Sequence, residues 1–550
     1  HLPSRAATMT FLADLVYFPG WNDGFTWLIV ISFIFAFLVS YGMGANDACN
    51  DWGTSVGAGT VKLWQAYILC AIFNTLGAVL LGYKVTETLR TGIVDVSIYD
   101  IYAQYDPISH SYKVVDHCDF LGEPSTTTTF APPTLPANGS ADIVQCARYT
   151  AADFMYGQVG TLLGVAVFMI VSSCFKIPVS ATHAIVGATL AASLYLRGNV
   201  GVKWAELAGI VLSWFLSPVI AGIFSSIFYL IVKYSVLMRR RTFECALNLC
   251  PLFMAFTLTV NLFACIYEGS KYLGFDKLNW WQALIISGAV GIIVGLIIHF
   301  PLRGFLRRRA ITLFEKDEKK KANGTFELRL APAPSAHKVV DVSSTIINGV
   351  ETKLPPGEIN PPPGPWYKYI NKNVPEDPLA SKVFNALQMV SASLLSFSHG
   401  ANDTGNTVGP LVAIWLTYKT GWALTPAETR DDMQLLLVFG AVAMIAGFAT
   451  LGHRTIKLIA KEITTEVSAP SGFAVELGTA FTVLFCAKLG IPVSSTHCAV
   501  GAVVFVGMSK STSEGVSWKT FGKICVVWLL CFPVSAVISF IMTWGLVKFC

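Results

Sequence analysis

The chain contains the stretch GANDACN at residues 44–50 and the closely similar stretch GANDTGN at residues 400–406. Each copy follows a long apolar run, at 26–41 and 383–397, so its carboxylate and two carboxamides lie at or inside the depth of a membrane. Ionisable groups at that depth are costly and mark functional sites. Helix capping by Asn and Asp is a simpler explanation, but it does not account for the recurrence of the whole motif.

The composition is that of a membrane protein. Of the 550 residues, 53% are hydrophobic and 13% are charged, whereas soluble domains carry about 25% charged residues. The net charge of +5 is small for this length and gives no indication of a nucleic-acid partner. We therefore expect an all-α polytopic membrane protein, with about 12 apolar runs that cross the bilayer.

The predicted spans fall into two halves separated by a polar linker. The linker is hydrophilic, begins with a basic run and contains few apolar residues. This composition predicts a largely disordered cytosolic segment. Its basic start is expected to be a solvated positive-inside anchor, and contact with anionic membrane lipid is the alternative. The expected organisation is an extracellular N-terminal segment at 1–25, a first repeat at 26–232 with an extracellular loop at 84–148, connecting transmembrane helices at 233–300, the linker at 301–381 and a second repeat at 382–550.

The loop at 84–148 carries more acidic than basic residues, a Thr- and Pro-rich tract, and a glycosylation sequon at Asn138. These features place it outside the cell. An external loop experiences oxidising conditions, so its two cysteines, Cys118 and Cys146, are a candidate disulfide. Two free thiols are the alternative.

A second motif also occurs twice, as IPVSATH at 177–183 and IPVSSTH at 491–497. The two motifs follow the same order in both halves, which indicates an internal duplication. The loop after residue 451 is basic and should be cytosolic, whereas its counterpart at 84–148 is acidic. Equivalent loops on opposite sides of the membrane predict two inverted-topology repeats with both termini extracellular.

The second motif suits an anion site. Its proline fits the first turn of a helix, and four hydroxyl groups add donors to the free amides of that turn: Ser180, Thr182, Ser494 and Thr496. A helix N-terminus attracts anions through its dipole and its amides. The apolar flanks predict re-entrant half-helices that meet near the membrane midplane. An ordinary proline kink, with Ser and Thr bonded back to the backbone, is the alternative.

The first motif suits a cation. The oxygens of Asp47, Asp403 and the neighbouring amides are ligands for a hard cation such as Na⁺. These carboxylates would repel an anion held at the helix ends unless cations or protons neutralise them. The combination therefore predicts cation-coupled anion transport. The sequence has no Walker A motif, which argues against ATP as the driving force, and no nucleophile–base pair that points to an enzyme.

The paired motifs and the linker between them resemble the inorganic phosphate transporter (PiT) family, and in particular its animal sodium-dependent members. The resemblance extends over 26–547 apart from the two long loops. It implies sodium-coupled import of inorganic phosphate by alternating access, with a transport domain that moves against a scaffold in an elevator-like manner. It also implies a glycosylated homodimer in the plasma membrane, with no cofactor beyond the co-transported Na⁺.

The resemblance also assigns site residues position by position. The residues it implies for phosphate binding are Ser180, Thr182, Ser494, Thr496, Asn46, Asn402, Asp47 and Asp403. The residues it implies for Na⁺ binding are Asp47, Asp403, Asn50, Asn406 and Glu476.

The chain departs from the family pattern at two positions. Asn74 and Gln158 stand where animal members have glutamate, so two buried charges are missing from the first half. If these positions handle coupling ions, stoichiometry or pH dependence changes; if the amides preserve the same hydrogen bonds, neither does. Two other functions stay open at this point, a proton-coupled phosphate or sulfate permease and a surface receptor or phosphate sensor.

Overall fold

The computed structural model describes residues 23–549 with several gaps. The internal segments left out are 100–101, 107–110, 115–146, 149–150, 268, 270–273, 323–343, 348–349, 354–355, 360–373, 375, 422, 424–430, 463–467 and 511–515. The predicted disulfide cysteines Cys118 and Cys146 and the predicted glycosylation site Asn138 lie outside the described residues.

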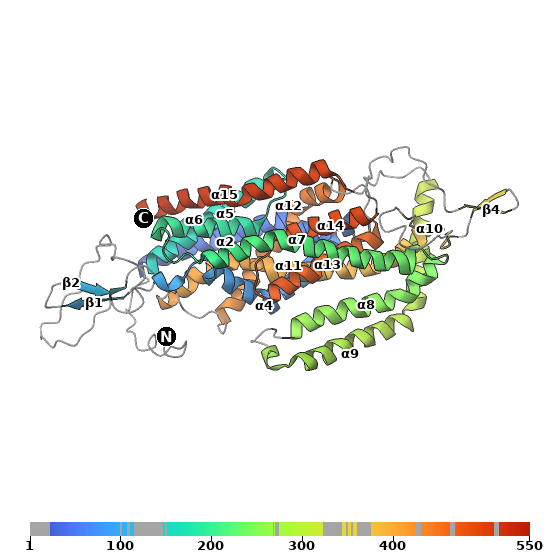
Figure 1. The fold of residues 1–550 in the computed structure, drawn as a ribbon, viewed down its shortest axis with the longest axis horizontal. Helices are drawn as coiled ribbons and strands as arrows, with labels where there is room; N and C mark the ends of the chain where they lie inside the picture. The colour runs from blue at the N-terminus through green and yellow to red at the C-terminus, as the bar shows by residue number, and fades with distance from the viewer. Residues whose placement is uncertain are drawn as a thin grey trace.

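Long helices that run roughly along one axis form the body of the molecule (Figure 1). The helices of the first half are α2 (Thr26–Asn46), α3 (Ala48–Gly57), α4 (Leu63–Thr91), α5 (Ala151–Cys174), α6 (Ala181–Arg197) and α7 (Trp204–Val232). The connecting helices are α8 (Thr242–Ile266), α9 (Trp280–His299) and α10 (Arg303–Ala322). The second half comprises α11 (Pro378–Thr420), α12 (Asp431–Glu462), α13 (Ala469–Lys488), α14 (Ser495–Lys510) and α15 (Trp518–Phe549). Short 3₁₀ or π segments are η1 (Asp23–Phe25), η2 (Val96–Tyr99), η3 (Lys233–Leu237) and η5 (Phe275–Lys277).

Two small antiparallel sheets lie at opposite ends of this bundle (Figure 1). One sheet has the order β2-β1-β3 and consists of β1 (Tyr102–Asp106), β2 (Ser111–Val114) and β3 (Ala147–Arg148). The other is a hairpin of β4 (Ser344–Ile347) and β5 (Val350–Lys353). The first sheet belongs to the loop predicted outside and the second to the linker predicted inside, so these segments project from opposite ends. The body between them is helical, as expected.

Nine of the described helical segments are long and apolar enough to cross a membrane. They are Thr26–Gly57 (α2 with α3), Leu63–Thr91, Ala151–Cys174, Trp204–Leu237 (α7 with η3), Thr242–Ile266, Trp280–His299, Asp432–His453 within α12, Ala469–Lys488 and Trp518–Phe549. Three other long helices of the bundle, α6, α11 and α14, carry three of the four motif copies, and the fourth copy lies across α2 and α3. The structure therefore supports a polytopic membrane protein, and the expected count of about 12 crossings depends on whether these three also cross.

Reciprocal helix contacts tie the two halves together. Helix α4 packs against α11, and its equivalent α12 packs against α2. Both pairs approach closely because the motif glycines have no side chain. A Cβ on Gly44 would overlap the carbonyl oxygen of Met444, and a Cβ on Gly400 would overlap that of Asn74. In the same way, α6 packs on α15 and α14 on α7. This arrangement agrees with the duplication in the sequence.

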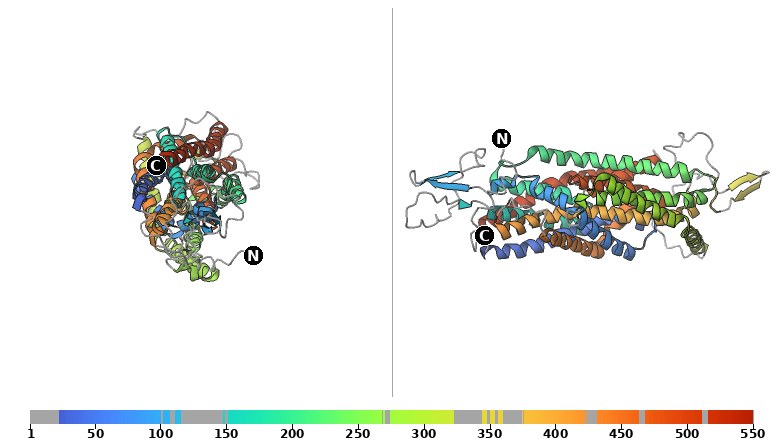
Figure 2. Two further views of the ribbon diagram at one scale, coloured as in Figure 1. Left: turned by 90° about the vertical axis from the view of Figure 1, so that its left-hand side faces the viewer. Right: turned by 90° about the horizontal axis from the view of Figure 1, so that it is seen from below.

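Helices α8 and α9 form a hairpin at one side of the bundle (Figures 1 and 2). The face of α9 toward α8 carries small residues, and the missing side chain of Gly291 makes room for Thr259. Its other faces expose large aliphatic side chains, among them Ile285 and Ile292. An apolar surface of this size is stable against lipid rather than water.

Two segments are more helical than the sequence predicts. Helix α4 continues to Thr91, past the expected start of the external loop at 84, because Leu89 is buried in the bundle. The linker expected to be largely disordered begins with α10 and contains the β4–β5 hairpin. Helix α10 is rich in Arg, Lys and Glu, which favour helix, and its Arg303 lies 3.3 Å from Glu244 of α8.

Candidate functional site

Both copies of the first motif lie in buried helix, but the two helices differ. In the first half, α2 and α3 are separated only by Asp47, whose backbone stays helical at φ −95° and ψ −44°. In the second half, α11 passes through residues 400–406 without interruption and is 43 residues long. The motif glycines therefore allow close packing and do not end the helix.

Both copies of the second motif begin a helix after an extended segment. Helix α6 has 17 residues and α14 has 16. The Ser180 Oγ accepts a hydrogen bond from the His183 amide at 3.3 Å, and the Ser494 Oγ accepts one from the His497 amide at 3.3 Å. These serines are N-caps, which satisfy amides of the first turn that have no partner within the helix.

The turn before each extended segment has the same left-handed backbone in both halves, but the surroundings differ. The φ angle is 59° at Lys176 and 71° at its counterpart Gly490. The second tip is docked, because Lys84 of α4 donates to the Lys488 carbonyl at 3.1 Å and the Lys488 Nζ donates to a carbonyl of α8 at 3.3 Å. Gly490 is buried there, whereas Lys176 and the neighbouring Phe175 are exposed. One tip is therefore held by hydrogen bonds to its neighbours, although its Leu489 is exposed, and the other tip is open.

The asparagine that precedes each motif aspartate holds an extended segment. Asn46 donates from Nδ2 to the Ile177 carbonyl at 2.8 Å and accepts at Oδ1 from the Val179 amide at 3.2 Å. Asn402 donates from Nδ2 to the Val493 carbonyl at 2.6 Å and accepts at Oδ1 from the Val493 amide at 3.4 Å. Val179 and Val493 occupy the same place in the second motif, so both halves position the start of α6 or α14 in the same way.

The last asparagine of each motif reaches the start of α14 or α6 in the other half. Asn50 Nδ2 donates to Thr496 Oγ1 at 2.7 Å, and Asn406 Nδ2 donates to Thr182 Oγ1 at 3.3 Å. Within the described part of the chain, the Oδ1 atoms of Asn50 and Asn406 are buried and have no hydrogen-bond partner. Buried acceptors without a partner are costly, and a bound cation satisfies them. The motif amides therefore fit Na⁺.

The two motif carboxylates converge on the same pair of helix starts. Asp47 and Asp403 are 2% and 1% exposed. Asp47 Oδ1 accepts a hydrogen bond from Thr496 Oγ1 at 3.4 Å. Asp403 Oδ2 accepts from Ser495 Oγ and lies 2.9 Å from Nε2 of His399. The two carboxylates of the duplicated motif thus converge, with more partners around Asp403.

Glu476 of α13 is the third buried carboxylate that the sequence singled out. It accepts four hydrogen bonds, from Thr54 Oγ1 at 2.5 Å, Ser55 Oγ at 2.7 Å, Gln388 Nε2 at 3.1 Å and Ser391 Oγ at 2.6 Å. Two of these donors lie on α3 and two on α11. Glu476 therefore joins three helices of the two halves.

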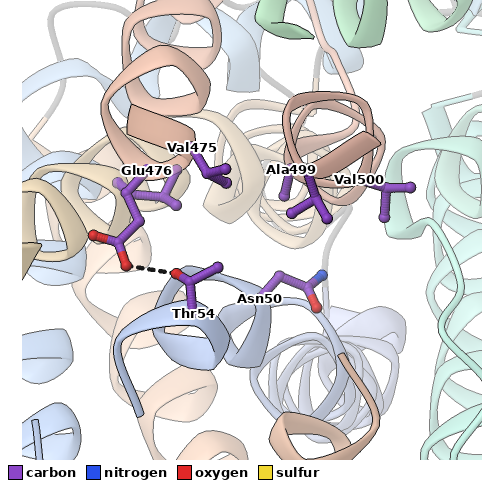
Figure 3. Close-up of a pocket in the computed structure, with 8 residues that line it drawn as sticks. Asn50, Thr54, Val475, Glu476, Ala499 and Val500 are labelled. Carbon is purple, nitrogen blue, oxygen red and sulfur yellow. Dashed lines mark hydrogen bonds between the residues drawn. The ribbon is translucent and has the colours of Figure 1, made fainter. Parts of the chain in front are cut away.

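A pocket opens beside Glu476, between α3, α11, α13 and α14. It is lined by Asn50, Thr54, Leu395, Val475, Glu476, Ala499, Val500 and Val503. Figure 3 shows Asn50 and Thr54 on α3 facing Glu476 on one side and Val500 of α14 on the other. Two of the residues expected to bind Na⁺, Asn50 and Glu476, thus line one space.

Two ionisable residues of this site, Asp51 and His399, are not among the site residues predicted from the sequence. The Nδ1 atom of His399 lies 3.0 Å from Asn74 Oδ1 and 3.7 Å from Asp51 Oδ2. The signal that could have found them is an ionisable residue in an apolar segment, one helical turn from a motif aspartate. Of the two expected coupling positions, Asn74 reaches the site through His399, whereas none of the site's described hydrogen bonds reaches Gln158.

The histidines of the second motif meet between the two halves. The rings of His183 and His497 are edge to face, with centroids 4.4 Å apart. His183 packs on Trp214 of α7, and His497 packs on Trp528 of α15. The starts of α6 and α14 are therefore neighbours.

A family model described as the phosphate transporter family matches residues 43–115 and 118–539. Among curated proteins, the chain is 28% identical to "Sodium-dependent phosphate transporter 1-B" of Danio rerio, covering 97% of both chains. It is 28% identical to "Sodium-dependent phosphate transporter 1" of Mus musculus, covering 93% of this chain and 94% of that one. It is 26% identical to "Sodium-dependent phosphate transporter 2" of Xenopus tropicalis, covering 94% and 97%.

The fold is also found among solved structures. A chain titled "The sodium-dependent phosphate transporter" matches with a TM-score of 0.68 and 23% sequence identity. The match covers 95% of this chain and all of that one. At this identity the similarity shows a shared fold.

Proposed function

Because the chain belongs to the phosphate transporter family, we propose that it imports inorganic phosphate together with Na⁺ by alternating access. The family and the apolar helices make it an integral membrane transporter, not an enzyme. The observation that carries the proposal is the reciprocal contact of Asn50 with Thr496 and of Asn406 with Thr182. It brings oxygen ligands for a cation within one hydrogen bond of two helix starts that attract an anion.

The cation side consists of motif carboxylates and amides. Asp47, Asp403, Asn50 and Asn406 supply oxygens around the two helix starts, and Glu476 supplies another carboxylate beside the pocket. Bound Na⁺ neutralises carboxylates that otherwise repel phosphate. The inside-negative membrane potential adds about 2.3 kcal/mol per 100 mV for each net positive charge carried.

The anion side consists of the first turns of α6 and α14. Their amides and dipoles attract phosphate, and Ser180, Thr182, Ser494 and Thr496 contribute hydroxyls, with Asn46 and Asn402 holding the segments in place. The serine hydroxyls already accept amide hydrogen bonds. They can still donate to a phosphate oxygen, because a hydroxyl carries both functions.

Alternating access is supported by the difference between the two tips. The docked tip at Lys488 contacts α4 and α8, whereas the tip at Lys176 is open. In an elevator-like movement, the half-helices shift against their neighbours so that the tips exchange these states. The two equivalent tips then take the docked and the open state in turn during the transport cycle.

The wider organisation is also part of the proposal. Residues 26–232 and 382–550 form inverted repeats of a protein with about 12 crossings, in which α6 and α14 are re-entrant half-helices. Both termini and the Asn138 loop are extracellular, the chain is a plasma-membrane homodimer, and 301–381 is cytosolic. In support, α15 ends at the end of the bundle where β1 and β2 lie, opposite β4 (Figure 1).

The test is radiolabelled phosphate uptake into proteoliposomes, with the Na⁺ gradient and the pH gradient varied independently. We expect uptake to follow an inward Na⁺ gradient and to fall to background when K⁺ replaces Na⁺. Uptake driven by the pH gradient without Na⁺, with competition by sulfate, would instead identify a proton-coupled permease. Phosphate binding without uptake would identify a receptor or sensor.

A further inference from the structure

His399 is completely buried between two groups of acceptors. On one side, its Nε2 lies 2.9 Å from Asp403 Oδ2. On the other side, its Nδ1 lies 3.0 Å from Asn74 Oδ1 and 3.7 Å from Asp51 Oδ2. The ring is therefore the link between a motif carboxylate of α11 and two residues on α4 and α3.

Asp51 is itself held in place. Ser396 Oγ donates to Asp51 Oδ2 at 3.1 Å, and Trp52 Nε1 donates to Ser396 Oγ at 2.7 Å. Asp51 is 1% exposed. Burying a carboxylate is costly unless charged or polar partners offset the loss of water, and here the partners are Ser396 and the His399 ring.

The duplicated fold does not require these charges. His399 lies four residues before Asp403, and the equivalent residue before Asp47 is Met43. Asp51 lies four residues after Asp47, and the equivalent residue after Asp403 is Thr407. Met444 corresponds to Asn74, because the backbone carbonyl of Met444 packs against Gly44 as the carbonyl of Asn74 packs against Gly400. Thr407 Oγ1 lies 3.3 Å from Met43 Sδ, so the same contact is made without ionisable groups.

We propose that Asp51 is a positioning residue for the cation site, acting through His399 on Asp403. It orients the imidazole, and the imidazole then fixes which oxygens of Asp403 are free for Na⁺, as partners of a ligating group do at metal sites. Asp51 on α3 and Asn74 on α4 face the same ring nitrogen of His399. This inference rests on the proposed function, since its readout is sodium-dependent uptake.

The test compares Asp51→Asn with the double variant Asp51→Asn/Asn74→Asp. Asp51→Asn removes the charge that faces the His399 ring at 3.7 Å, and should raise the Na⁺ concentration for half-maximal uptake about tenfold. The KM for phosphate at saturating Na⁺ should stay within about twofold of wild type. The double variant should recover most of the Na⁺ affinity, because the carboxylate returns to the same ring atom from α4.

Thr407→Asn, at the matched position of the other half, is the control and should leave Na⁺ dependence unchanged. If Asp51→Asn does not fold, Ser396→Ala removes a donor to Asp51 without changing charge and should weaken Na⁺ affinity by a smaller factor. Unchanged Na⁺ dependence in the folded variants, or no recovery in the double variant, would overturn the positioning role. Wild-type uptake that ignores Na⁺ would instead contradict the proposed function.

Discussion

The two motif aspartates differ in their surroundings although they occupy equivalent places in a duplicated fold. Asp403 lies beside His399 and Ser495, and the charged region continues through His399 to Asp51. Asp47 has a single described side-chain partner, Thr496 at 3.4 Å. The helices that precede the second motif show the same contrast. Glu476 of α13 corresponds in the first half to an uncharged residue, Leu162 of α5.

The difference separates what the duplication shares from what it does not. The shared residues are the motif glycines, asparagines, serines and threonines, which pack helices and position the half-helices. Apart from the aspartates and the paired histidines His183 and His497, the ionisable residues of the site are Asp51, His399 and Glu476, and none of these three has an ionisable counterpart in the other half. The site is therefore duplicated in its framework residues but not in its charged residues, and the cation positions proposed at Asp47 and at Asp403 should not be equivalent.

The largest expected effect tests the shared framework. Gly44→Ala and Gly400→Ala each place a Cβ on a backbone carbonyl of the opposite half, and overpacking against rigid backbone should cost about 3 kcal/mol of folding stability. Melting temperatures of purified protein should fall equally for both. Gly288→Ala is the control, because its Cβ meets nothing within 4 Å. A fall for only one glycine would contradict equivalent packing.

The next effect tests the unequal aspartates. Asp403→Asn disturbs contacts with Ser495 and His399, and each hydrogen bond to a charged group contributes about 1.5–3 kcal/mol. We expect sodium-dependent uptake to fall about 100-fold for Asp403→Asn and about 10-fold for Asp47→Asn. Initial rates at matched protein amounts measure both. Equal losses would mean that the surroundings of Asp403 do not matter for transport.

A smaller effect is expected at Glu476. Glu476→Gln replaces a carboxylate oxygen that accepts hydrogen bonds with an amide that donates, so at least one of four donors loses its partner. We expect a loss of about 2 kcal/mol of stability, read as a lower melting temperature that added Na⁺ no longer raises. Leu162→Met, at the equivalent position, should cost less than about 1.5 kcal/mol and keep the response to Na⁺.

The smallest effect concerns the tips. A residue other than glycine in the left-handed region costs about 1–2 kcal/mol, so Lys176→Gly should relieve strain that Gly490 does not have. We expect a melting temperature raised by the equivalent of about 1 kcal/mol. Gly490→Ala should lower it by a similar amount. A destabilised Lys176→Gly would show that the lysine side chain makes contacts that outweigh the strain.

Much of this site could be predicted because its framework residues occur in two copies in the sequence. Two copies of each motif in the same order predict that Asp47 and Asp403 converge, and the second motif predicts two helix starts. The proline is predicted in the first helical turn, but Pro178 and Pro492 lie in the extended segments, because serine caps α6 and α14 two residues later. The unbroken course of α11 could not be predicted in this way, since Gly400 and Gly405 suggest a break but are used for close packing against α4.

The residues missed in the sequence are those without a duplicate. Asp51 and His399 are far apart in the chain, and only packing of α3 against α11 brings them together. Their counterparts Thr407 and Met43 are uncharged, so comparison of the halves alone makes them look variable rather than functional. Contacts of this kind depend on tertiary structure and leave no periodic signal.

The open tip has a practical consequence, because its residue at the position of Lys488 is Cys174. Among the ten cysteines that the structure describes, Cys174 is exposed and the others are buried or half-buried. The protein thus carries a native thiol where its two tips differ most. A membrane-impermeant maleimide that labels Cys174 from one face of the membrane, and more slowly once substrates close the tip, would report the movement of this hairpin without any engineered label.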